Sequence, residues 1–178
     1  MARVTAPVPY TDGSTREQAA WSALASVPDP ELPAISIVDL GIVREVSLAA
    51  DGGLVVALTP TYSGCPATAV IRADVEAALT TAGLSPFRIE TRLAPAWSTD
   101  WISKQGRARL ADYRIVTPGP AGEQEGAQSV LHFHPRPLAC PHCASRRTER
   151  LAAFGSTACK ALHRCLDCGE PFEHFKPL

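Results

Sequence analysis

The chain has 178 residues and a formal net charge of −1, with 46% hydrophobic and 20% charged residues. This length fits one moderate domain with a small addition, and the composition is that of a globular protein with its own core. The near-neutral charge gives no electrostatic basis for binding nucleic acid, and no apolar run is long enough to span a membrane. Residues 1–11 lack the apolar core of a signal peptide. We therefore expect a reducing cytoplasm, where six cysteines are metal ligands or reactive thiols before they are disulfides.

The first predicted element is a helix that begins at a capping box formed by Ser14 and Glu17. Apolar residues at helical spacing continue it to Pro28, which ends it because the preceding residue is pushed out of the helical region. An acidic turn follows at residues 29–33, Asp-Pro-Glu-Leu-Pro. Its two prolines leave the backbone little freedom, so the carboxylates are presented in fixed directions. Asp39 follows in a short segment before Gly41.

A sheet is predicted next. Residues 42–48 are rich in branched side chains and predict a strand, and Asp51-Gly52-Gly53 is a hairpin turn signal. Residues 54–58 are apolar at successive positions, which is typical of a strand buried on both faces. A helix over 67–82 and an alternating strand over 87–93 complete a parallel crossover. The predicted fold class is therefore α/β, with a small mixed three-stranded sheet and helices.

The loop Thr59-Pro60-Thr61-Tyr62-Ser63-Gly64-Cys65-Pro66 joins the buried strand to this helix. The pattern places Pro66 at the first helical position and Cys65 at the cap. There the free backbone N–H groups and the helix dipole favour the thiolate, which binds metal or attacks an electrophile. The alternative is an inert, buried cysteine that fills space beside the turn.

After the sheet, Ser98, Thr99 or Asp100 can cap a further helix that runs to about Tyr113. Trp97 and Trp101 are interpreted as a packing device over an edge of the core, and the alternative is a platform for ligand stacking. We expect a first domain at residues 14–117. Residues 118–137 are a linker by composition, and its His132 and His134 are more typical of a solvated linker than of a metal site.

Residues 138–178 contain two Cys-x-x-Cys knuckles, Cys140/Cys143 and Cys165/Cys168, with 21 residues between them. This spacing predicts a tetrahedral structural zinc site in a ribbon-like β module that the metal folds. A rubredoxin-type iron has the same ligand set and stays open as an alternative. Cys159 lies outside the four-ligand pattern, and spacing does not define its role.

Several motifs, in this order, resemble known families. The first group is similar to the iron–sulfur cluster assembly domain family, to which SufT belongs, and comprises residues 29–33, 36–43 and 59–66. The second group resembles the PaaD (PaaJ) family and comprises residues 95–101, 154–162, 170–172 and 175–176, together with the two knuckles. PaaD proteins are accessory subunits of the bacterial phenylacetyl-CoA epoxidase system. The resemblance runs from about Trp21 to the C-terminus.

The resemblance implies the small α/β fold of the assembly family followed by a zinc-ribbon-like tail. It maps a cysteine thought to hold or pass iron or a cluster onto Cys65, and acidic residues onto Asp29, Glu31 and Asp39. It also implies that the chain is not itself catalytic. Its implied role, in aerobic phenylacetate breakdown, is to mature a metal centre in the di-iron oxygenase or the iron–sulfur reductase subunits.

A maturation factor with one thiolate per chain needs a second ligand from elsewhere, which predicts a homodimer or a complex. Two other functions stay open. One is a zinc-stabilised scaffold that holds epoxidase subunits together through the ribbon and the Trp97/Trp101 edge, with Cys65 purely structural. The other is a cysteine-nucleophile enzyme such as a thioesterase. Residues 1–131 contain no histidine, so the usual Cys–His pair would need one from the tail.

Overall fold

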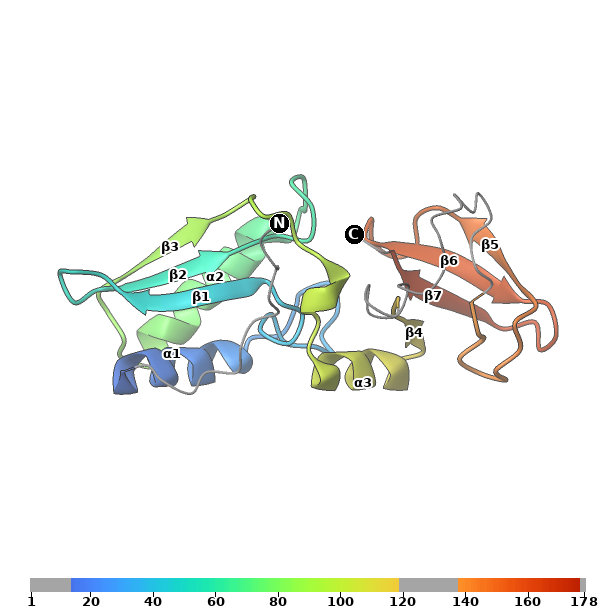
Figure 1. Ribbon diagram of the computed structural model, residues 1–178, viewed down its shortest axis with the longest axis horizontal. Coiled ribbons are helices and arrows are strands. Elements are labelled where there is room, and N and C mark those ends of the chain that lie inside the picture. Colours follow the sequence, from blue (N-terminus) through green and yellow to red (C-terminus); the bar gives the residue numbers. More distant parts are fainter. Residues whose placement is uncertain (1–13, 119–137, 177–178) are drawn as a thin grey trace, which may run out of the picture. The chain divides into compact units, whose positions relative to one another are not determined.

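A computed structural model describes residues 14–118 and 138–176, so most of the predicted linker lies outside the described residues. The chain divides into two compact units, residues 1–106 and residues 107–178. The first is an α/β unit and the second a small β unit, which confirms the predicted fold class (Figure 1). In the described part of the chain, no helix has the length and apolar character needed to cross a membrane.

The first unit is built on a three-stranded sheet in the order β1-β2-β3. Strand β1 (Val43–Leu48) pairs antiparallel with β2 (Leu54–Leu58), and β2 pairs parallel with β3 (Phe87–Thr91). The hairpin between β1 and β2 turns at Gly52, whose φ is +79°. The predicted hairpin and the predicted parallel crossover are therefore both confirmed.

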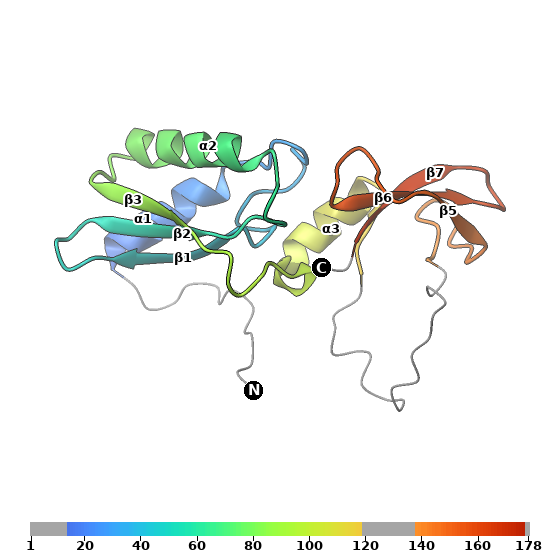
Figure 2. The same cartoon turned by 90° about the horizontal axis from the view of Figure 1, so that it is seen from above.

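Two helices cover one face of this sheet. Helix α1 (Thr15–Ala25) and helix α2 (Thr68–Thr81) lie on the same side of the strands, and α1 packs against α2 and β1 (Figures 1 and 2). The apolar stripe of α2 is buried, and so are the residues that share a face of the sheet in register. These residues are Ile71, Val75 and Leu79 from α2 and Val46, Val56 and Ile89 from the strands. Helix α1 starts at the predicted capping box, with the hydroxyl of Ser14 accepting the N–H of Glu17.

The opposite face of the sheet carries a bridge of charged side chains. Glu45 and Glu90 flank Ala57 in register, and Ala57 is fully buried between them. Arg92 joins the two carboxylates, with Nη1 2.6 Å from Glu45 Oε2 and Nη2 3.4 Å from Glu90 Oε2. The hydrogen bond from Arg92 lowers the pKa of Glu45. Strand β2 is thus buried on both faces as predicted, and this ion-pair bridge lies across its second face.

The segment after β3 differs from the prediction of one helix from residues 98–100 to about 113. It forms a short 3-10 helix, η1 (Thr99–Trp101), and then helix α3 (Lys104–Asp112). Ser98 caps the first, and the hydroxyl of Ser103 accepts the N–H three residues further on and starts the second. Ile102 between them is extended, with ψ 124°. The single-helix expectation is wrong because two serine caps divide the segment.

The two tryptophans of this segment are packed into the core, as predicted. Trp97 and Trp101 are 3% and 2% exposed. The indole N–H of Trp97 donates to the carbonyl of Leu40 at 3.0 Å. Gly41, the next residue, has φ +76°, and a Cβ there would lie 2.7 Å from both Cβ and the carbonyl oxygen of Trp101. Only glycine provides both the backbone angle and the space that this contact requires.

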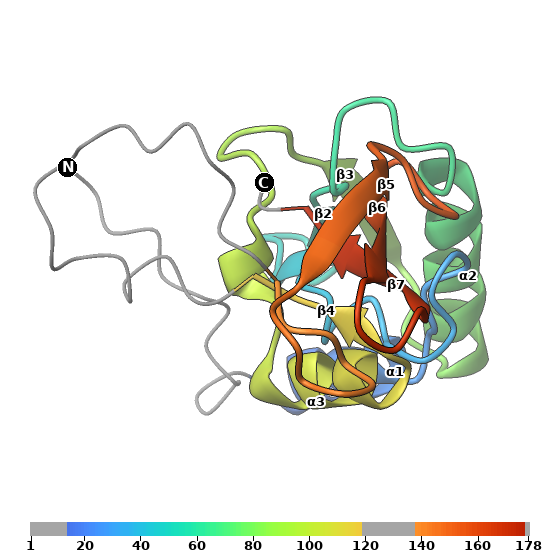
Figure 3. The ribbon, with the colours of Figure 1, turned by 90° about the vertical axis from the view of Figure 1, so that its right-hand side faces the viewer.

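The second unit contains a four-stranded sheet in the order β4-β7-β6-β5. The strands are β4 (Ile115–Val116), β5 (Thr148–Ala152), β6 (Lys160–Cys165) and β7 (Pro171–Phe175), and Figure 3 shows the last three side by side. Strand β4 is parallel to β7, and the other pairs are antiparallel. Residues 115–116 were expected in the first domain, whereas they pair with the sheet of the second unit. Phe172 and Phe175 are the large buried side chains of this sheet.

We predict that Gly41→Ala destabilises the first unit by about 3 kcal/mol, because an L-residue at positive φ costs about 1–2 kcal/mol and the new methyl group overlaps Trp101. Urea unfolding followed by tryptophan fluorescence measures the loss. Gly52→Ala is the matched control, since Gly52 has φ +79° but nothing within 4 Å of an added Cβ. Equal losses in the two variants would show that the contact with Trp101 contributes nothing.

Candidate metal centre and the Cys65 loop

Four cysteine sulfurs converge at one end of the ribbon. Cys140 and Cys143 lie on the turn before β5, Cys165 ends β6, and Cys168 lies in the turn that leads to β7. Their Sγ atoms all lie within 4.8 Å of one another, with 3.7 Å between Cys140 and Cys168 and 3.5 Å between Cys143 and Cys165. A tetrahedral ion about 2.3 Å from each sulfur requires S–S distances of about 3.8 Å. The four thiols therefore fit a tetrahedral metal ion.

Backbone geometry and one carboxylate hold the two knuckles in place. The N–H of His142 points at Cys140 Sγ at 3.4 Å, and Gly169 turns the second knuckle with φ +78°. Asp167, inside the second knuckle, accepts hydrogen bonds from Ser145 Oγ and Arg147 Nη1, which follow the first. Sequence reasoning missed this clamp. Its only signal in the sequence is an acidic residue between the two cysteines of a knuckle.

The electrostatics of the four thiols favour a bound cation. Hydrogen bonds from the backbone N–H groups of Cys168 and Asp167 lower the pKa of Cys165 to about 6. The N–H of Glu170 lowers the pKa of Cys168, but burial and the neighbouring thiols outweigh it and raise the value to about 12. Four thiolates at these distances repel one another unless a cation neutralises them. The cluster therefore has the chemistry of a site for a divalent metal as well as the geometry.

The other candidate ligands of the tail have different surroundings. Cys159 is buried, and its sulfur lies 3.0 Å from Thr157 Oγ1, outside the group of four. His163 stacks on Phe172 with ring centroids 5.6 Å apart. His132 and His134 lie outside the described residues.

Cys65 lies in the loop between β2 and α2, and its thiol is free and half-buried. Its N–H donates to the carbonyl of Tyr62 at 3.1 Å, and its own carbonyl accepts the N–H and hydroxyl of Thr68. The prediction that Pro66 is the first helical residue is wrong by two positions, since a turn at residues 66–67 precedes the helix. The thiol therefore stands just before the first turn of α2, at the end of the sheet.

The three carboxylates predicted to assist Cys65 have clear structural surroundings. Asp29 is 5% exposed, and its Oδ1 accepts the N–H groups of Glu31 at 2.9 Å and Leu32 at 2.8 Å. Asp39 accepts the hydroxyl of Ser103, the residue that starts α3. The side chain of Glu31 is half-buried. Among the described residues, three or more potential metal ligands gather only at the four tail cysteines, so these carboxylates form no such cluster with Cys65.

Comparison with known proteins also divides the chain into two parts, and the boundary between the two units lies in the stretch that neither family match covers. Residues 17–84 match the family described as iron–sulfur cluster assembly protein. Residues 124–176 match the PaaD zinc beta ribbon domain. The metal-ligand geometry of the tail and the family match thus point to the same kind of module.

One relative matches most of the chain, and two others match about half of it. The chain is 46% identical over 157 residues to a protein of Escherichia coli named as a putative subunit of 1,2-phenylacetyl-CoA epoxidase, an alignment that covers 88% of this chain and 90% of that protein. It is 33% identical over 88 residues to an Fe-S protein maturation auxiliary factor of Porphyromonas gingivalis, covering 49% of this chain and 83% of that protein. The crystal structure of a domain of unknown function from Bacillus anthracis matches with a TM-score of 0.50 at 30% identity, covering 53% of this chain and 91% of that one.

We predict that Cys143→Ser removes the tail's metal and unfolds the second unit. The small apolar core of the ribbon is not enough to keep it folded once the metal is lost. Metal analysis of the full-length protein and hydrogen exchange of residues 138–176 measure both losses. Cys159→Ser is the matched control and should keep the metal, since its sulfur is outside the group of four. A variant at Cys143 that keeps both its metal and the protection of β6 would rule out the four-cysteine site.

Proposed function

Since the chain belongs to the PaaD family of phenylacetyl-CoA epoxidase subunits, we propose that it is a non-catalytic accessory factor of that epoxidase. Its role is to help assemble or deliver an iron or iron–sulfur centre to the oxygenase or reductase subunits. The observation that carries this proposal is the match of the first unit to iron–sulfur cluster assembly proteins, with one free thiol at the end of its sheet. None of the six cysteines, all in the described part of the chain, forms a disulfide, which suits a reducing cytoplasm.

Cys65 is the proposed transient ligand. It is half-buried, so it is accessible to a partner, and it is the only cysteine of residues 1–106. One thiolate leaves a metal or cluster incompletely coordinated, so a second copy of the chain or an epoxidase subunit supplies the other ligands. Glu31 is proposed as a further ligand only within such a complex, because the described residues of one chain gather no third ligand with Cys65 and Glu31. Asp29 contributes by holding the turn that carries Glu31, and Asp39 by binding Ser103, the residue that starts α3.

The tail has a different proposed role. Its four cysteines hold zinc permanently, because a closed set of four thiolates leaves no open position for exchange or catalysis. Zinc brings no redox chemistry and stabilises the ribbon by joining its two knuckles. The iron alternative, with the same ligands, is decided by metal analysis.

We predict that the two sites lose different metals. After anaerobic purification, Cys140→Ser should lack zinc and keep any iron, whereas Cys65→Ser should lack iron and keep zinc. Inductively coupled plasma analysis of the wild type and both variants measures this. Iron in place of zinc at the tail would overturn the zinc assignment, and iron retained in Cys65→Ser would remove Cys65 as its ligand.

In cells, Cys65→Ser should lower the metal content and activity of the epoxidase to the level found without the accessory chain. The physical reason is that serine does not provide a thiolate at physiological pH. Cys159→Ser, which also removes one thiol, should leave both quantities unchanged. Full epoxidase activity with a folded, zinc-containing Cys65→Ser protein would reject the maturation role.

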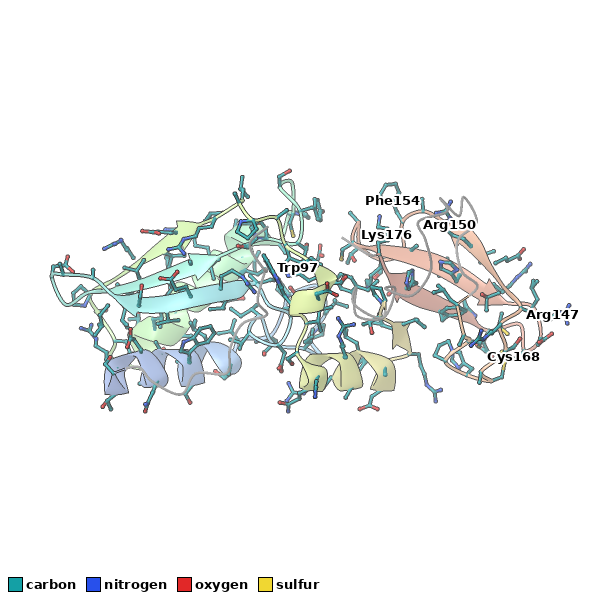
Figure 4. The ribbon with its side chains drawn as sticks, in the orientation of Figure 1. Trp97, Arg147, Arg150, Phe154, Cys168 and Lys176 are labelled. Carbon is teal, nitrogen blue, oxygen red and sulfur yellow. The ribbon has the colours of Figure 1, made fainter. Side chains whose placement is uncertain are left out.

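One observation favours the scaffold alternative. Phe154 and Leu151 on the ribbon are 65% and 49% exposed, and Lys176 Nζ lies 4.3 Å from the centroid of the Phe154 ring. Figure 4 shows Phe154 and Lys176 at the end of the ribbon opposite Cys168. Such an exposed aromatic residue beside a cation is typical of a protein-binding surface.

A scaffold predicts that Phe154→Ser abolishes co-purification with the epoxidase subunits. Leu166→Ser is the control. Leu166 is also an exposed apolar residue of the ribbon, at 47%, but it lies in the second knuckle, away from Phe154. A pure scaffold also predicts normal epoxidase activity in Cys65→Ser, which is the opposite of the result expected for a maturation factor. The two functions are therefore separated by the same pair of variants.

A further inference from the structure

Two buried hydrogen-bond donors of the first unit have no acceptor among the described residues. They are Arg44 Nη1 and Trp101 Nε1. The two side chains are in contact, because the guanidinium carbon of Arg44 lies 3.4 Å from the centroid of the Trp101 ring. Trp101 is 2% exposed, and Arg44 is half-buried. Two side chains in contact, one of them charged, therefore each carry a buried donor without an acceptor in the described part of the chain.

This arrangement is costly. A buried donor without a partner costs about 1–3 kcal/mol, and a charged one costs more. The burial of Arg44 lowers its pKa, as expected for a cation without a facing carboxylate. Arg88 and Arg92 on the same sheet both have glutamate partners within 3.4 Å. Arg44 is thus distinguished by its surroundings rather than by its residue type, and such groups in native proteins call for an explanation.

The backbone determines the positions of both donors. The register of β1 and β2 shifts between Val43 and Glu45, so Arg44 is the extra residue of a bulge, a feature that re-aims a side chain. Trp101 is fixed by its close backbone contact with Gly41. The indole N–H of Trp97 is used to hold the segment through Leu40, whereas that of Trp101 is not used in this way. The position of the Trp101 ring therefore does not depend on its N–H.

We propose that Arg44 and Trp101 form a binding site for one carboxylate group. One oxygen accepts Nη1 of Arg44 and the other accepts Nε1 of Trp101, which satisfies both donors and neutralises the cation. A single negative charge matches the single positive charge, and a carboxylate has two neighbouring oxygens for the donors of two side chains that are in contact. This site involves neither Cys65 nor the tail cysteines, so it goes beyond the proposed metal role.

The site lies at the sheet end from which the Cys65 loop departs. Val43 is the register partner of Leu58, and the carbonyl of Ile42 accepts the N–H of Thr59, where that loop begins. The carboxylate has two sources, a free small acid or an acidic side chain of an epoxidase subunit. Both present the same group to Arg44 and Trp101, and the experiment separates them.

The indole N–H signals of the full-length, ¹⁵N-labelled protein provide the test. The chain has three tryptophans, and Trp101→Phe identifies the signal of Trp101 by its loss. Titration with sodium acetate should move that signal downfield in a saturable way, since the N–H gains an acceptor. The signal of Trp97 should not move, because its N–H already donates to Leu40. Sodium chloride at equal ionic strength is the salt control.

Charge variants test the partner donor. Arg44→Gln should abolish the acetate-dependent shift, and Arg44→Lys should weaken it, because lysine keeps the charge without the planar fork. Arg88→Gln, an exposed arginine of the same sheet, should leave it unchanged. In the second arm, epoxidase subunits replace acetate. If acetate shifts the Trp101 signal, a free small acid is enough to occupy the site. If only the epoxidase subunits shift it, the carboxylate comes from a side chain of the partner.

Two results would overturn the site. One is a Trp101 signal that moves with neither acetate nor the subunits, which would mean that hydration alone satisfies the donors. The other is a shift of equal size in the wild type and in Arg44→Gln, which would mean that Arg44 takes no part. The titration does not depend on metal content, so failure of this site leaves the proposed role of Cys65 standing.

Discussion

The first unit depends on a single turn, residues 36–41, in which backbone groups and one glycine join elements far apart in the sequence. The N–H of Ile37 donates to Val27 after α1, and its carbonyl accepts the N–H groups that start β1. Asp39 binds the residue that starts α3, and Leu40 accepts the indole of Trp97. The helix, the sheet and the tryptophan segment therefore meet at one point, where Gly41 leaves room for the Trp101 backbone.

The second unit is stabilised in a different way, because its apolar core is small. At one end the four cysteines converge, and at the other Lys160, whose side chain is 3% exposed, binds Glu173 at 2.6 Å. Glu173 also accepts the N–H of Ser156, which fixes the turn between β5 and β6. Breaking a buried pair of this kind costs about 3–5 kcal/mol. The four cysteines at one end and this buried ion pair at the other thus hold the strands of the ribbon in one arrangement, and removing one partner of the pair would leave a buried charge uncompensated.

The features that the sequence predicts well are those determined by neighbouring residues. The capping box at Ser14, the turn at Gly52 and the paired cysteines need only local spacing, and all are found where expected. The division of the segment after β3 was missed, since its second cap at Ser103 is tied to Asp39, a contact 64 residues apart in sequence. The Asp167 clamp and the Arg44–Trp101 contact depend on tertiary structure in the same way, so spacing alone does not reveal them.

A site that keeps a metal and a site that passes one on need opposite ligand sets. The tail supplies four thiols within 4.8 Å of one another, which closes the coordination shell and leaves no position for exchange. The first unit supplies one thiol, together with two donors that have no acceptor among its described residues. A partner that completes the shell of a metal on Cys65 must bring ligands, and carboxylates are among them. The site proposed at Arg44 and Trp101 selects for that same group, so in these proposals recognition of the partner and completion of the metal site both use carboxylate side chains.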